Sequence, residues 1–170
     1  MYIVGDLSIK GDLKTVFNKI MKYLKENQLL ITDEQGTPLN EVEISEILKS
    51  NNSYHFRTSK ISIIEDDFIK NTIDYINKAE TLYKEIAEAE NEGLIIQAFI
   101  DLTNSLAEIQ KVSGYFNIHI ISIEQINNLA SMALEKVQQG DIEFVNDIIE
   151  YEILPQLVDF KTKLLERQSH

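Results

Sequence analysis

The spacing of apolar residues changes near Ser62, and this change constrains the fold more than any other feature of the chain. Before Ser62, short apolar runs alternate with turn signals and with helix-length stripes. After it, apolar residues recur at intervals of three and four to the C-terminus, which is the spacing of one face of an α-helix. The sequence therefore predicts an α+β protein with two domains: a small α+β domain over residues 1–60 and a helical domain over residues 62–168.

The N-terminal domain is predicted to contain four strands and two helices. Asp12 fits the N-cap position of the first helix, and Asn40 with Glu43 has the spacing of a capping box. Pro38 has no N–H, so the strand that contains it suits only the edge of a sheet. The order is the ferredoxin-like βαββαβ pattern, in which both helices pack on one face of the sheet. The predicted elements are, in chain order, residues 2–9, 12–27, 29–32, 37–39, 40–50 and 53–58.

Residues 62–168 are predicted to form four consecutive amphipathic helices. Ser62 with Glu65, and Ser122 with Gln125, have capping-box spacing. Short connections make neighbouring helices antiparallel, so this domain should be an up-down four-helix bundle. A proline inside the last helix, at position 155, removes one hydrogen bond and should kink it. The residues expected in the bundle core are Phe68, Ile76, Phe99, Leu106, Leu134 and Ile149.

The chain carries a formal net charge of −12, which repels phosphate backbones and anionic lipid surfaces. We therefore expect no nucleic-acid partner and no membrane contact. The N-terminus has an acid at Asp6 and no basic segment before a long apolar stretch, so no signal peptide is expected. No uncharged run approaches the roughly 20 residues of a membrane span. The expectation is a soluble, cytoplasmic protein.

No catalytic, metal or cofactor motif stands out from the sequence. The chain has no cysteine, which excludes disulfides, thiolate zinc sites and cysteine nucleophiles. His55, His119 and His170 lie in different predicted elements, so no metal site is expected. The glycine patterns of nucleophile elbows, phosphate-binding loops and dinucleotide sites are missing as well. We therefore expect a protein that uses no cofactor or metal and is not an enzyme.

Three segments of the chain resemble an uncharacterised family of Gram-positive bacterial proteins. They are GDLSIKGDLKTVFNKIMKYL, LITD and GDIEFVNDIIEYEILPQL. The resemblance implies a small N-terminal α/β unit followed by a helical bundle. It implies no activity, because the family has none established.

Residues 115–121 are the first candidate for an interaction surface. Connections in helical bundles are normally polar and exposed, whereas this run carries five large apolar side chains: Tyr115, Phe116, Ile118, Ile120 and Ile121. The alternative is that the preceding helix continues, since Ile109, Val112, Phe116 and Ile120 keep helical spacing. One helical stripe could not bury all five side chains, so either case leaves apolar area for a contact.

The open face of the predicted sheet is a second candidate surface. It would offer Tyr2, His55 and Arg57, without the sequence motif of RNA-recognition domains. We expect this face to pair with the bundle, with a partner strand or with a second copy of the chain.

Three functions stay open at this point. The first is a non-catalytic adaptor that binds protein partners and also associates with itself as a homodimer. The second is an acidic helical-bundle chaperone of the secretion or flagellar type, which receives an amphipathic helix in a groove. The third is a small-ligand binder or enzyme with a pocket between the two domains.

Overall fold

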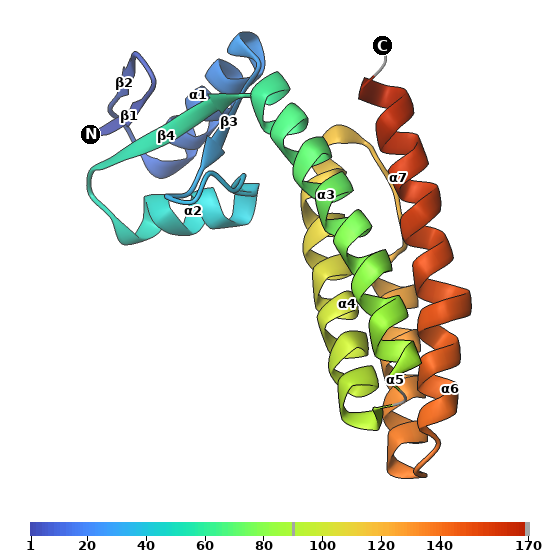
Figure 1. Cartoon of the computed structure of the whole chain (residues 1–170). Coiled ribbons are helices and arrows are strands. Elements are labelled where there is room, and N and C mark those ends of the chain that lie inside the picture. Colours follow the sequence, from blue (N-terminus) through green and yellow to red (C-terminus); the bar gives the residue numbers. More distant parts are fainter. Residues whose placement is uncertain (90, 169–170) are drawn as a thin grey trace. The chain divides into compact units, whose positions relative to one another are not determined.

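The computed structural model describes residues 1–89 and 91–168. Contacts divide the chain into two compact units, Met1–Asp66 and Asp67–His170. Figure 1 shows a small sheet with helices in the first unit and long helices in the second. The division falls inside helix α3 (Ile61–Glu88), which follows the last strand without a break. It lies a few residues later than the expected boundary because this strand and helix are continuous.

The sheet of the first unit has four strands in the order β2-β1-β4-β3. Strand β1 (Tyr2–Val4) is antiparallel to β2 (Leu7–Ile9) and parallel to β4 (Tyr54–Lys60). Strand β3 (Leu29–Thr32) is antiparallel to β4. The sheet is therefore mixed, with β1 and β4 in its interior.

This topology differs from the expected ferredoxin-like βαββαβ order. Residues 2–9 form a hairpin rather than one strand, because Gly5 turns the chain with a φ of +55°. A Cβ at Gly5 would lie 2.7 Å from the Tyr23 hydroxyl, so backbone angle and space both favour glycine. Residues 37–39 add only an isolated bridge between Thr32 and Pro38, since proline has no N–H with which to extend a ladder. The order along the chain is ββαβαβ.

Helices α1 (Leu13–Asn27) and α2 (Glu41–Ser50) complete the core of this unit. The predicted caps are confirmed: Asp12 caps α1, and Asn40 forms a capping box with Glu43. One hydrophobic cluster joins both helices to one face of the sheet. Its buried members are Tyr2, Val4, Ile9, Val16, Ile20, Leu24, Ile31, Ile44, Leu48 and Phe56.

The second unit consists mainly of helices that lie side by side in Figure 1. The capping box of Ser122 and Gln125 is confirmed, and Asp141 caps the next helix. Ser62 lies inside α3 rather than at its N-cap, because strand β4 runs directly into that helix. The helices that follow α3 are α4 (Glu92–Ser113), α5 (Ile123–Gln138), α6 (Ile142–Asp147) and α7 (Leu154–Gln168).

A π-helical turn (Ile148–Ile153) joins α6 to α7 just ahead of Pro155. The Leu154 N–H donates to the carbonyl of Ile149, five residues back, where an α-helix would reach four. In an α-helix, a residue four positions further along the chain lies about 40° further around the helix axis. The extra residue in the π-helical turn offsets this rotation. The disturbance expected at Pro155 therefore takes the form of a widened turn in one continuous helical run. The buried residues that it keeps on one face, at steps of four, are Val145, Ile149, Ile153 and Leu157.

Most of the expected core of the helical unit is confirmed, with Ile76, Phe99, Leu106 and Ile149 all buried. Phe68 is half-buried, and its ring centroid lies 5.6 Å from that of Phe116. The prediction for Leu134 is wrong, because 61% of this residue is exposed. Ala133 is buried in its place, since a step of one residue rotates the side chain by about 100° around the helix.

Candidate functional site

The connection between α4 and α5 begins with a short 3-10 helix (Gly114–Phe116). Asn117 then adopts a left-handed conformation with a φ of 54°, which ends the helical path. The Ile118 N–H donates to the carbonyl of Ser113 at 3.1 Å and ties the loop back to α4. The alternative in which the helix continues through Ile120 is therefore wrong.

The five apolar residues of this connection divide into two groups. Phe116, Ile118 and Ile121 are buried, whereas Tyr115 and Ile120 are half-buried. Three of the five candidate side chains therefore belong to the core, and the apolar area left for a contact belongs to Tyr115 and Ile120. Among these five residues, Ile120 both lines a surface hollow and is partly exposed.

Two hollows lie between this loop and α7. The first has a volume of about 300 Å³ and is lined by Ile120, Pro155, Gln156, Asp159, Phe160 and Lys163. The second has a volume of about 660 Å³ and is lined by Asn117, Ile118, His119, Lys163, Glu166 and Arg167. Because Lys163 borders both, the hollows form one surface feature, which we call the loop–α7 groove.

The loop–α7 groove has an apolar floor and a charged rim. Phe160 and Ile118 are buried at its base, and Ile120 adds a half-buried aliphatic side chain. On the rim, the Lys163 ammonium lies 2.7 Å from the Asp159 carboxylate, and both side chains are largely exposed. An exposed ion pair of this kind contributes little to stability, so a ligand could rearrange it at low cost.

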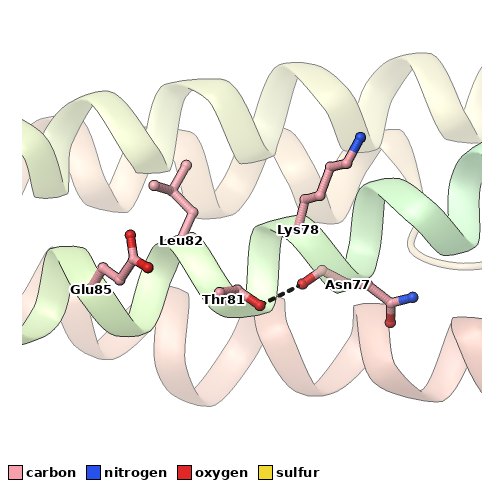
Figure 2. A pocket seen from close by; sticks show the side chains of 5 residues that line it. All are labelled: Asn77, Lys78, Thr81, Leu82 and Glu85. Atoms are coloured by element: carbon pink, nitrogen blue, oxygen red, sulfur yellow. Dashed lines mark hydrogen bonds between the residues drawn. The ribbon is translucent and has the colours of Figure 1, made fainter.

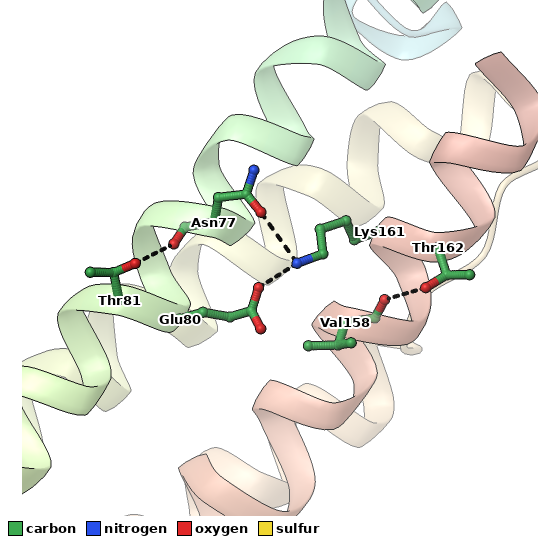
Figure 3. Close-up of polar contacts among 6 residues, drawn as sticks. All are labelled: Asn77, Glu80, Thr81, Val158, Lys161 and Thr162. Atoms are coloured by element: carbon green, nitrogen blue, oxygen red, sulfur yellow. Dashed lines mark hydrogen bonds and ion pairs between the residues drawn. The ribbon is translucent and has the colours of Figure 1, made fainter. Parts of the chain in front are cut away.

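Helix α7 is held against α3 on a different side from the groove. The Lys161 ammonium forms an ion pair with Glu80 and donates to the side-chain oxygen of Asn77 at 3.2 Å, as Figure 3 shows. Lys161 and Lys163 are two residues apart, so they point about 200° apart around the helix. The wall of the groove is therefore supported from behind by contacts with α3.

A third hollow, of about 370 Å³, lies on α3 itself (Figure 2). All its lining residues come from that one helix, and the Thr81 hydroxyl among them donates to the carbonyl of Asn77. Leu82 is its main apolar contribution. Because residues from two elements line the loop–α7 groove and one helix alone lines this hollow, the groove is the better candidate site.

Acidic residues dominate the helical run that leads into the groove. Residues 141–160 contain six Asp and Glu and no Lys or Arg. Burial raises the pKa of Tyr83 to about 12, and the carboxylates of Glu150 and Asp147 contribute to the rise. The Glu150 carboxylate also raises the pKa of the exposed Tyr151. The carboxylate contributions to both shifts indicate a negative potential around this part of the helix.

The structure does not bring Tyr2, His55 and Arg57 onto one surface. The register pairs Ile3 with His55 and Tyr2 with Tyr54, and side chains alternate along a strand, so Tyr2 faces away from His55. Tyr2 is buried, and its hydroxyl donates to the main-chain carbonyls of Leu48 and Asn51. His55 and Arg57 are exposed and share the opposite face of β4. The expected grouping of the three is corrected: only the last two share a surface.

The α7 side of the groove was not predicted from the sequence. Pro155, Gln156, Asp159 and Lys163 have the composition of an ordinary solvated helix face. Their meeting with residues 117–120 is a long-range contact that no local spacing indicates. Within residues 1–89 and 91–168, no group of three or more His, Asp or Glu is placed to hold a metal ion.

A comparison with family models matches residues 67–163 to a domain of unknown function, DUF8042. The matched segment contains the whole α4–α5 connection and the part of α7 that borders the first hollow. Neither the curated proteins nor the solved structures contain a match. None of the helices in the described part of the chain has the length and apolar character needed to cross a membrane.

Proposed function

Because this chain belongs to the DUF8042 family, whose description assigns no activity, we propose its function from the surface of its helical unit. We propose that it is a non-catalytic interaction protein, an adaptor, and that the loop–α7 groove is where it holds a protein partner. The supporting observation is the apolar floor bordered by paired charges. Protein–protein interfaces have this anatomy, with an apolar centre and a polar rim that stays hydrated.

Several finer expectations from the sequence belong to the same proposal. The helices of the second unit would form an up-down four-helix bundle. The protein would act in the bacterial cytoplasm, without a nucleic acid, membrane, metal or cofactor. A homodimer is a further form that the adaptor could take.

The charge distribution favours one special case of this function, the acidic helical-bundle chaperone. Residues 67–170 contain 18 of the 28 Asp and Glu but only 8 of the 16 Lys and Arg. A negative potential of this kind attracts basic segments and raises their rate of association. A chaperone that shields a basic amphipathic segment would use both the charge and the groove.

The test is a pull-down from a lysate of the source organism with the tagged, full-length chain. Ile120→Asp places a charge on the groove floor, whereas Leu134→Asp makes the same change on the exposed side of α5. Melting temperatures of both variants establish first that each is folded. A protein partner that is captured by the wild type and by Leu134→Asp, but not by Ile120→Asp, supports the proposal.

Two results would contradict it. Equal capture by both variants would place the partner somewhere other than the groove. A small metabolite that co-purifies with the wild type and is lost from Ile120→Asp would favour the third function, a small-ligand binder or enzyme.

A further inference from the structure

We propose that the segment held in the loop–α7 groove is a basic amphipathic helix, lying along α7. This assignment rests on the proposed function, because it names the class of partner segment that the groove would hold. Three features of the described residues carry it: the length of the groove, the state of its main-chain groups, and the pattern of acidic and apolar residues on α7.

The groove has the length of a short helix. Its α7 wall extends from Pro155 to Arg167, which is about 18 Å along a helix axis. The two hollows follow one another along this wall, one over Ile120 and Phe160 and the other over Ile118. A helix lying along α7 could therefore place an apolar side chain in each hollow from one of its faces.

The groove offers few main-chain partners to an extended peptide. From Gln156 to Lys163 the N–H and C=O groups of its α7 wall are used within the helix, whereas binding by strand addition needs an exposed sheet edge. Along this helical wall an extended peptide would leave its own N–H and C=O groups without protein partners. A helix satisfies these groups internally, so it fits a helical wall better.

The charges beside the groove favour a basic occupant. Asp159 and Glu166 both line it, and Glu152 lies four residues before Gln156 on the same side of the run. Lys163 and Arg167 also line the groove, so the lining itself is balanced in charge; the excess of acid comes from the adjoining run of residues 141–160, which contains no cation. Lysine or arginine side chains on the flanks of a docked helix would meet these carboxylates.

An apolar residue followed directly by an acidic one recurs every seven residues along α7 and the turn before it. Val158 precedes Asp159, and Leu165 precedes Glu166; Tyr151 and Glu152 form a similar pair in the π-helical turn. Val158 is 37% exposed and Tyr151 is 65% exposed. Seven residues is the interval at which one helix repeats its contacts with another. Asp159 and Glu166 line the groove itself, and the apolar members extend the surface beside it, which complements a helix that has both aliphatic and basic residues.

The experiment measures binding of synthetic helical peptides to the full-length chain by fluorescence anisotropy. The probe is a labelled peptide of about 18 residues, about five turns long, with Leu on one face and Lys on its flanks. One control replaces every Lys by Glu, and a second keeps the composition but scrambles the order. We expect the basic amphipathic peptide to bind at least about tenfold more tightly than either control. Its affinity should fall as the salt concentration rises.

Two sets of variants locate the binding. Ile120→Asp should weaken binding of the basic peptide at least about tenfold. Glu152→Lys combined with Asp159→Lys should do the same and should improve binding of the acidic control peptide. The matched control, Asp74→Lys combined with Glu108→Lys, makes the same change in net charge on exposed positions of α3 and α4. Equal losses in the two charge-reversed pairs would show that net charge alone attracts the peptide, and would overturn the proposal.

The remaining outcomes separate this proposal from the proposed function. If the basic peptide does not bind but the lysate partner still depends on Ile120, the function stands and the basic helix is wrong. If the protein alone sediments as a dimer that Ile120→Asp dissociates, a second copy occupies the groove, and the basic helix is again wrong.

Discussion

The hydroxyl of Tyr83 on α3 donates to two oxygens of Asn146 on α6, the side-chain Oδ1 at 2.9 Å and the main-chain carbonyl at 3.2 Å. Asn146 lies two residues before the π-helical turn. One partly buried hydroxyl therefore joins α3 to the helical run at the point where its geometry starts to change.

Removing this hydroxyl should destabilise the protein. In Tyr83→Phe the aromatic ring stays, but both contacts to Asn146 are lost. We expect the free energy of unfolding to fall by about 1 kcal/mol, the usual contribution of one hydrogen bond. Urea unfolding measures the change, with Tyr151→Phe as the matched control on an exposed tyrosine nearby. An unchanged stability in Tyr83→Phe would show that the hydrogen bonds contribute nothing net.

The same tyrosine should make stability depend on alkaline pH. The pKa of Tyr83 is about 12 in the folded chain, above its ordinary value of 10. Between these two values the unfolded chain loses the phenol proton before the folded chain does. The Tyr83 contribution to stability is therefore complete below pH 10 and is lost as the pH rises towards 12.

The measurement for this pH effect is the difference between wild type and Tyr83→Phe, so that other titrating groups cancel. The wild type should lose stability more steeply than Tyr83→Phe above pH 10. Parallel curves for the two proteins would exclude the raised pKa.

Core packing predicts unequal effects for two leucines. Leu106 is 1% exposed, so Leu106→Ala should cost about 2–5 kcal/mol of unfolding free energy. Leu134 was expected in the core but is exposed, so Leu134→Ala should change stability by no more than about 0.5 kcal/mol. Denaturant unfolding of both variants tests the correction directly. Similar losses in the two would mean that Leu134 is buried in solution.

The π-helical turn should tolerate the loss of one residue. Glu152 is exposed. Deleting it changes the spacing of the buried residues Val145, Ile149, Ile153 and Leu157 from four–four–four to four–three–four, which an ordinary α-helix keeps on one face. We expect this deletion to preserve helical circular dichroism and cooperative melting. Deleting Asp159 is the control, because it would rotate Phe160 and Leu164 by about 100° away from the core. Unfolding of the Glu152 deletion variant would show that the wide turn has a role beyond spacing.

Signals carried by neighbouring residues were predicted well from the sequence. The caps at Asp12, Asn40 and Ser122 are confirmed because each depends on a side chain and a backbone N–H within three residues. The apolar stripes gave helices in the expected places for the same local reason. Ser62 was misplaced because β4 runs directly into α3 and leaves no capped start at that point.

Half of the candidate site could also be predicted from the sequence. Residues 115–121 were identified as an unusual apolar connection, and Ile118 and Ile120 do line the groove. The other half, on α7, was not predicted, because an exposed helix face looks the same whether it borders a groove or open solvent.

By itself, then, the sequence determined where the helices and the strands β3 and β4 lie, how most helices begin, and the acidic character of the second unit. These properties depend on spacing and charge over a few residues. The tertiary structure alone decided the strand order, the burial of Ile118 and Ile121, the exposure of Leu134 and the meeting of the loop with α7. Each of these is a choice among several surfaces with similar apolar spacing, and only the packing of residues far apart in the chain selects one.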